Sequence, residues 1–247
     1  MKKIFGNLLT LLLIFPFLGS HMLNAQSADE ILAKYYKVCG SPEIWKTYKT
    51  MKMEGTASTQ GISLNGTVLT MRPNKQKVEF DFQGMKIIEA YDGKNAWSIN
   101  PFMGATTAQL SDSLKANEMA KQTFEDELIG YKDKGHKVSY EGEDEVEGAK
   151  VYKIKLTKKS GEDVFYFIDK ENNVPILIKS FVNTGADKGG IIENYLSDYQ
   201  EIDKGVMMAH ATKIVSNGAT VLEMTITKVE MNPSDVSDAT FQMPTDK

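Results

Sequence analysis

The chain is poor in the residues that build catalytic and metal sites. Its 247 residues contain one cysteine, Cys39, and three histidines. His136 and His210 are far apart in the sequence, and neither has a carboxylate or thiolate partner at a ligand spacing, which argues against a metal site. A single cysteine excludes an intrachain disulfide. We interpret Cys39 as a small buried hydrophobic residue rather than a reactive thiol.

Enzyme motifs are also missing. The sequence has no nucleophile elbow and no glycine-rich phosphate loop. We therefore predict no enzymatic activity, no metal and no cofactor, although a hydrolytic site assembled from scattered residues is not ruled out by motifs alone. The net charge of −4 comes with no basic cluster, and this argues against nucleic acid as a partner.

Only one long apolar run is present, and it lies at the start of the chain. Lys2 and Lys3 precede the apolar residues Leu8 to Leu18, and Ala25 is a small residue at a suitable cleavage position. This pattern predicts a secretory signal peptide over residues 1–25, because the run is too short for a stable membrane anchor. No cysteine near the cleavage position is available for lipidation. We expect residues 26–247 to form one soluble periplasmic domain.

The predicted mature chain opens with signals for two helices. Ser27 and Glu30 form a capping box, in which both side chains satisfy free N–H groups of the first helical turn. Apolar residues follow at helical spacing, and Gly40 is suited to end the helix. Pro42 favours the start of a second, short helix.

From about Met51 the apolar period changes to two, which predicts strands with one apolar face. Asn65-Gly66 and Asn217-Gly218 predict tight hairpin turns, because both residue types tolerate a positive φ. The strands follow one another through short connections, so an antiparallel meander is expected. One segment, Ser111 to Tyr131, interrupts the strands, and we predict a helix around Leu114–Lys121 with a second short helix after it.

The block from Gly66 to Leu110 carries the strongest signal of relationship. Its ordered elements are Arg72-Pro73, Asp92-Gly93, Trp97 and Asn100-Pro101-Phe102. In this order and spacing they resemble the LolA/LolB-like family of periplasmic lipoprotein carriers. The rest of the chain resembles the LolA-like proteins of Bacteroidetes that are called outer-membrane lipoprotein-sorting proteins.

The resemblance implies a mainly β (α+β) fold, an incomplete antiparallel β-barrel with an N-terminal helix and an inserted helical lid. It also implies a monomeric carrier that binds lipid or lipoprotein acyl chains in an apolar cavity. Such a carrier passes its cargo toward the outer membrane, between donor and acceptor proteins of the envelope.

Arg72 is the only arginine among the 29 basic residues. The resemblance implies that its guanidinium hydrogen-bonds the lid and keeps the empty cavity shut. A planar fork of five donors holds several oxygens at fixed angles, whereas lysine offers one mobile charge. The alternative is a surface arginine that pairs with a nearby carboxylate.

Apolar residues on the predicted strands are candidates for the lining of the cavity, since methionine and aromatic side chains adapt to irregular apolar ligands. The candidates are Met71, Val78, Phe80, Phe82, Met85, Ile87, Trp97 and Ile99. The same residues could instead fill the interior completely. In that case the protein would be a non-enzymatic scaffold of the envelope that binds another protein on its open β-face.

Overall fold

The computed structural model describes residues 27–183 and 188–245. The predicted signal peptide lies outside these ranges. Within them, no helix is long and apolar enough to cross a membrane.

The described chain is mainly β. Two helices come first, α1 (Ala28–Cys39) and α2 (Pro42–Thr47), and α1 begins with the predicted capping box between Ser27 and Glu30. The first strands are β1 (Thr50–Thr59), β2 (Ile62–Met71), β3 (Lys75–Phe82), β4 (Met85–Tyr91), β5 (Ala96–Asn100) and β6 (Ala105–Leu110), with the 3₁₀ helix η1 (Pro101–Met103) between the last two. After α3 (Ser113–Ala120) come β7 (Lys137–Val146), β8 (Ala149–Thr157), β9 (Asp163–Asp169), β10 (Pro175–Phe181), β11 (Ile191–Asp203), β12 (Val206–Ser216), β13 (Ala219–Met231) and η2 (Asp238–Phe241).

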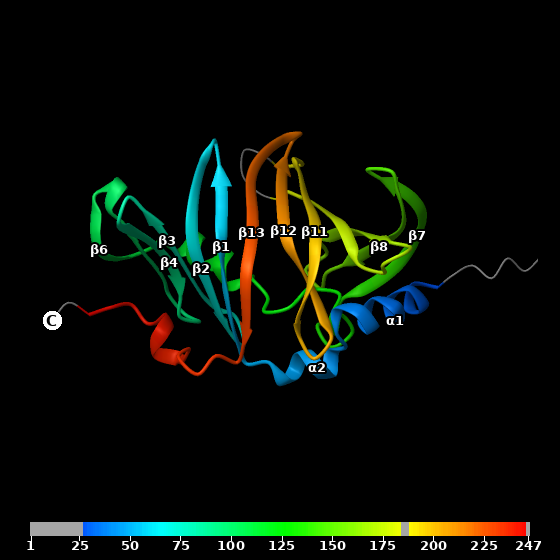
Figure 1. Cartoon of the computed structure of the whole chain (residues 1–247), viewed down its shortest axis with the longest axis horizontal. Coiled ribbons are helices and arrows are strands. Elements are labelled where there is room, and N and C mark those ends of the chain that lie inside the picture. The colour runs from blue at the N-terminus through cyan, green and yellow to red at the C-terminus, as the bar shows by residue number, and fades with distance from the viewer. Residues whose placement is uncertain (1–26, 184–187, 246–247) are drawn as a thin grey trace, which may run out of the picture.

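All these strands form one antiparallel sheet in the order β6-β5-β4-β3-β2-β1-β13-β12-β11-β10-β9-β8-β7. The chain meanders from β1 out to the edge at β6, and a second meander starts at the opposite edge with β7. This second meander ends where β13 pairs with β1. The two edge strands do not pair with each other, so the sheet is curved but not closed, and the predicted incomplete barrel is confirmed (Figure 1).

Residues 111–136, called the inserted segment below, connect the two edges of the sheet and therefore cross one of its faces. In Figure 1 this green stretch of chain passes behind β13 and β12. We call the crossed face the inner face, and Met51 of β1 belongs to it, in one cluster with Phe124 of the inserted segment. The opposite, outer face is covered near β2 by the C-terminal segment, residues 232–245, where Phe241 packs against Leu69.

The main core lies between the inner face, α1, α2 and the inserted segment. Full burial of each large apolar side chain contributes roughly 1.5–3 kcal/mol to folding, and this cluster holds most of the largest buried ones. Its most buried members are Ile31, Leu32, Tyr35, Tyr48, Leu128, Ile154, Leu156, Ile168 and Val206.

Two local predictions are wrong. Asn65-Gly66 lies within β2 rather than in a turn, and the hairpin between β1 and β2 turns at Gln60-Gly61. The turn predicted at Asn217-Gly218 is confirmed. The inserted segment contains only one helix, α3, because the residues after it form successive turns instead of the second short helix.

Candidate functional site

Arg72 lies where the inserted segment meets the inner face. Its Nε donates to the carbonyl of Tyr48 at 2.8 Å, and its Nη2 donates to the carbonyl of Trp45 at 2.9 Å. Both carbonyls belong to the end of α2. The guanidinium carbon lies 4.4 Å from the ring centroid of Phe124, and Nη2 lies 2.5 Å from a carboxylate oxygen of Glu125. Arg72 thus ties the inserted segment to α2.

The contact between Arg72 Nη2 and the Glu125 carboxylate is an ion pair without hydrogen-bond geometry. The Glu125 side chain is 10% exposed and also lies 3.3 Å from the ammonium of Lys134. Two cations, Arg72 and Lys134, thus lie beside this carboxylate. The charge of Glu125 is therefore compensated within the closed structure.

The neighbouring acid, Asp126, is half-buried. Its carboxylate accepts hydrogen bonds from the Leu128 N–H at 2.8 Å and from the Tyr35 hydroxyl at 3.3 Å. Burial raises the pKa of Asp126, although the hydrogen bonds and Lys134 oppose this shift. Burial also raises the pKa of the Cys39 thiol to about 12, so this cysteine is buried and protonated as expected.

Two cavities lie between the inner face and the inserted segment. The larger, of about 270 Å³, extends toward β10, β11 and β12 and is lined mainly by apolar and aromatic side chains, among them Trp45, Ile129, Ile178, Leu196 and Met208. The smaller, of about 210 Å³, extends toward β2 and β3. Met51 and Phe124 line both cavities. These two side chains therefore stand between the two spaces.

Beyond the inserted segment, the inner face carries a partly exposed apolar band, on which no described α-helix packs and against which η1 places only the ring of Phe102, 5.2 Å from that of Phe82. Register defines one row of the band, because directly paired residues point to the same face: Ile87 pairs with Phe80, Phe80 with Gly66, and Gly66 with Gly55. The next row toward the hairpin tips adds Met85, Phe82, Leu64, Ala57 and Met224. Phe80, Phe82 and Ile87 remain partly exposed and belong to no core cluster.

The predicted lining residues divide between the two faces. Five of them lie on the inner face, namely Val78, Phe80, Phe82, Met85 and Ile87. The other three, Met71, Trp97 and Ile99, lie on the outer face. The strand period places them there, since Ile99 pairs with Ile88 and Trp97 with Ala90, which alternate with the inner-face residues of β4.

The outer-face residues belong to the packing of the C-terminal segment. Trp97 is 2% exposed, and its indole N–H donates to the Phe241 carbonyl at 2.9 Å. Ile99 packs in the same cluster with Met243, and Met71 packs beside Leu69 and Phe241. The structure keeps Trp97 and Ile99 apart from the inner-face band, whereas Met71 also lines the cavity of about 210 Å³ together with Val68.

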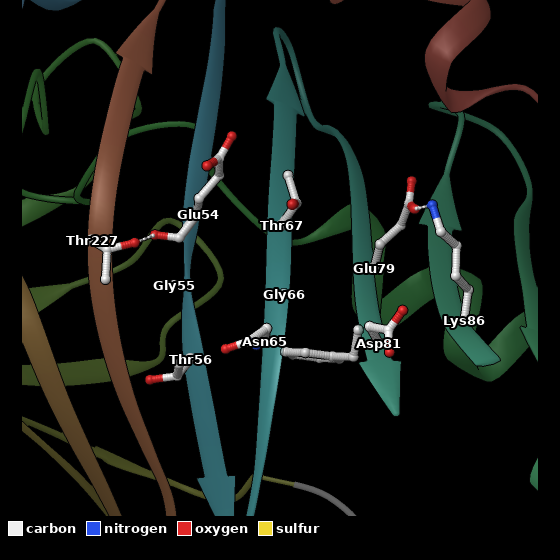
Figure 2. A pocket seen from close by; sticks show the side chains of 11 residues that line it. Glu54, Gly55, Thr56, Asn65, Gly66, Thr67, Glu79, Asp81, Lys86 and Thr227 are labelled. Carbon is white, nitrogen blue, oxygen red and sulfur yellow. Dashed lines mark hydrogen bonds and ion pairs between the residues drawn. The ribbon is translucent and has the colours of Figure 1, made fainter. Parts of the chain in front are cut away.

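A groove of about 380 Å³ on the outer face, over β13, β1, β2, β3 and β4, is lined by eight polar or charged residues and by Gly55, Gly66 and Phe80 (Figure 2). Glu79 in this groove pairs with Lys86 at 2.9 Å, and the Thr227 hydroxyl donates to the Glu54 carbonyl at 3.1 Å. Acyl chains do not suit such a lining, because its polar groups would lose their hydration. No group of three or more potential metal ligands occurs in residues 27–183 and 188–245.

Sequence reasoning did not identify Phe124, Glu125 or Asp126 as members of the site. The three residues lie in an irregular stretch after α3, where no periodic pattern marks a buried side chain. The only available signal was the apolar Phe124 itself, which stands alone between polar neighbours. Arg72 was identified because its motif resembles a family, not because of its local pattern.

An open antiparallel sheet wrapped around a helical segment is the architecture of a LolA-like half-barrel. Neither a family model nor a curated protein matches the chain. Solved structures do match it. One is a DUF1329 family protein from Desulfovibrio piger, with a TM-score of 0.57 and 15% identity over 86% of this chain and 97% of that one.

A putative outer membrane lipoprotein-sorting protein domain from Vibrio parahaemolyticus has a TM-score of 0.56 and 10% identity, covering 86% of this chain and 94% of that one. A LolA superfamily protein from Nitrosomonas europaea has a TM-score of 0.55 and 11% identity, covering 88% of this chain and 98% of that one. These matches confirm the LolA-like fold that the block from Gly66 to Leu110 predicts. The assignment to the Bacteroidetes type stays a prediction.

Proposed function

We propose that the protein is a non-enzymatic periplasmic carrier that binds the acyl chains of lipid or lipoprotein cargo on its inner face. The observation that carries this proposal is the partly exposed apolar band around Phe80, Phe82 and Ile87, which lies on the same face as the 270 Å³ cavity. Contiguous exposed apolar surface is typical of ligand-binding grooves and interaction sites.

The exposed apolar side chains support an entry at one end of the sheet. Of the eight large ones in residues 27–183 and 188–245, six lie near the turns at that end, namely Ile62, Met85, Phe102, Met103, Phe181 and Val221. In Figure 1 the β1–β2 and β12–β13 hairpins reach this end, opposite α1 and α2. The turns Gln60-Gly61, Gln83-Gly84 and Asn217-Gly218 contain no charged residue. An acyl chain entering there would meet apolar and neutral groups.

The energetics of carriage fit this arrangement. Burial of an acyl chain yields ~0.8 kcal/mol per methylene group, so one chain supplies ample driving force for binding. Release requires a competing state, and closure of the inserted segment over the inner face provides one. Arg72 would stabilise the closed state through α2, Phe124 and Glu125. In this proposal Arg72 is the gate residue, and the five inner-face candidates line the acyl site.

The predicted signal peptide supports a periplasmic location, and the lipoprotein-sorting domain among the similar structures supports lipoprotein cargo. The envelope proteins that donate and accept the cargo, and a monomeric state, are part of the same proposal.

Native mass spectrometry of the protein purified from its own cell envelope tests the proposal. We expect bound lipid or lipoprotein, and uptake of a fluorescent fatty acid by the stripped protein. Phe82→Ser should weaken uptake, whereas Thr67→Ser on the outer face serves as the matched control. A protein that is empty in every preparation and takes up no fatty acid would instead favour the scaffold function.

A further inference from the structure

The smaller cavity differs in chemistry from its larger neighbour. About half of its lining residues are polar, whereas the 270 Å³ cavity is mainly apolar. The polar lining residues lie on β2, on β3 and its preceding turn, and in the inserted segment: Thr70, Asn74, Lys75, Gln76, Gln122 and Thr123. The apolar remainder consists of Met51, Met53, Val68, Met71 and Phe124. A cavity with this lining is poorly suited to hydrocarbon alone.

The lining of this cavity provides no free charge. Lys75 is its only ionisable residue, and the Lys75 ammonium forms an ion pair with Asp238 of η2, on the C-terminal segment that covers the outer face. An ionised headgroup placed in the cavity would lack a counter-charge, and this would make its desolvation costly. The chemistry of the cavity therefore selects a neutral polar group.

Two amide side chains are held in a fixed orientation at its wall. The Asn74 amide N–H donates to the Ala120 carbonyl at 3.1 Å, and the Gln76 amide N–H donates to the Met119 carbonyl at 3.3 Å. Both carbonyls lie at the end of α3. The amide oxygens of Asn74 and Gln76 accept no hydrogen bond from the described residues, so they are available as acceptors for another group.

A hydroxyl in the same wall lacks a partner. The Thr70 side-chain oxygen is buried and has no hydrogen-bond partner among the described residues. Thr70 pairs with Gln76 in the sheet, so both side chains point to the inner face. Buried hydroxyls without partners are rare, and each calls for an explanation such as a ligand.

We propose that this cavity is a polar subsite for a neutral group that both accepts and donates hydrogen bonds, such as a secondary amide. The Thr70 hydroxyl donates to the carbonyl oxygen of that group, and the oxygen of Gln76 or Asn74 accepts its N–H. A volume of 210 Å³ corresponds to roughly seven water molecules, enough for an amide and the first carbons attached to it.

The subsite rests on the proposed acyl-binding function, since the chain joined to the amide would occupy the neighbouring cavity. Such a ligand passes between Met51 and Phe124, the two residues common to both cavities. The protein would then recognise the linkage as well as the chain, and this distinguishes an N-acylated cargo from a plain hydrocarbon or an ionised fatty acid.

The test uses two competitors of equal chain length, N-methyldecanamide and dodecane, to displace a fluorescent fatty acid from the full-length mature protein. Thr70→Val removes the hydroxyl and keeps the shape of the side chain. We expect Thr70→Val to lower the affinity for N-methyldecanamide by roughly three- to tenfold, the effect of one hydrogen bond. The affinity for dodecane should be unchanged. Thr70→Ser should retain the wild-type affinity for both.

Thr67→Val is the matched control, because Thr67 lies on the same strand but faces the outer groove in Figure 2. Thr67→Val should change the affinity for neither competitor. Equal weakening of both competitors by Thr70→Val would assign the hydroxyl a purely structural role and overturn the subsite. If Thr70→Val changed the affinity for neither competitor, the polar subsite would also be refuted, while the proposed acyl-binding function would stand. Failure of the fluorescent fatty acid to bind the wild type would refute the proposed function itself.

Discussion

The guanidinium of Arg72 lies over the ring of Phe124, with 4.4 Å between the guanidinium carbon and the ring centroid. The same guanidinium donates to the carbonyls of Tyr48 and Trp45. One side chain therefore joins the β2–β3 turn, the end of α2 and the inserted segment. Two alternatives were considered for this arginine, a gate and a surface ion pair. They are compatible, because the carboxylate that pairs with Arg72, that of Glu125, belongs to the inserted segment.

Arg72→Lys should loosen the inserted segment. An ammonium cannot reproduce two angled donors and a flat stacking surface, so we expect a loss of about 1–3 kcal/mol in the free energy of unfolding. Hydrogen exchange should accelerate across residues 111–131. Lys94→Arg, in the exposed β4–β5 turn, is the control and should have no effect. If hydrogen exchange in Arg72→Lys equalled that of the wild type, Arg72 would not hold the inserted segment and would be an ordinary surface residue.

Asp126→Asn should remove a pH dependence of stability. Burial raises the folded-state pKa of Asp126 above its ordinary value. At a pH between the unfolded-state and folded-state pKa values of Asp126, the folded protein binds more protons than the unfolded protein. The free energy of unfolding therefore falls as the pH rises from the lower pKa to the higher one, and it stays lower at higher pH. Asparagine keeps an acceptor for the Leu128 N–H and has no charge to bury.

Urea unfolding at pH 4 and at pH 8 measures this effect. The wild type should lose more stability between the two values than Asp126→Asn does. Other titrating groups are common to both proteins, so the difference between the two isolates Asp126. An identical pH dependence in the two proteins would contradict the direction of the pKa shift.

The two faces of the sheet predict opposite responses to substitution. Trp97→Phe removes the hydrogen bond to the Phe241 carbonyl and should cost about 1–3 kcal/mol of stability, with faster exchange in residues 232–245. It should leave fatty-acid affinity unchanged. Phe82→Ser, on the partly exposed inner-face band, should reduce that affinity and cost little stability. A fall in affinity for Trp97→Phe without a fall in stability would reverse this assignment.

The sequence was informative where a local rule coincided with the tertiary structure. The capping box at Ser27 and the turn at Asn217-Gly218 depend on neighbouring residues alone, and both predictions are confirmed. Period-two alternation identified strands, but it does not say which face is covered by what. Trp97 is as apolar as Phe80, and only the path of the C-terminal segment, which is a tertiary property, places it in a different cluster.

The inserted segment was the least predictable part for the same reason. Its buried members after α3 lie in an irregular stretch, and the partners that hold them come from α1, α2 and the β2–β3 turn. Asp126 and Tyr35 are 91 positions apart. No local pattern reports such a contact, so both the compensation of Glu125 and the burial of Asp126 had to come from the structure.

Gly66 shows why a turn signal failed, and it supports a final prediction. A Cβ atom at this position would lie 2.5 Å from the ring of Phe80 and 2.9 Å from the Glu79 carbonyl oxygen, so the glycine makes room for the ring in the middle of β2. Gly66→Ala should therefore cost about 1–3 kcal/mol by overpacking, as measured by urea unfolding. In a Phe80→Leu background the cost should become smaller without vanishing, because the backbone contact remains. An equal cost in both backgrounds would show that Phe80 is not the reason for the glycine.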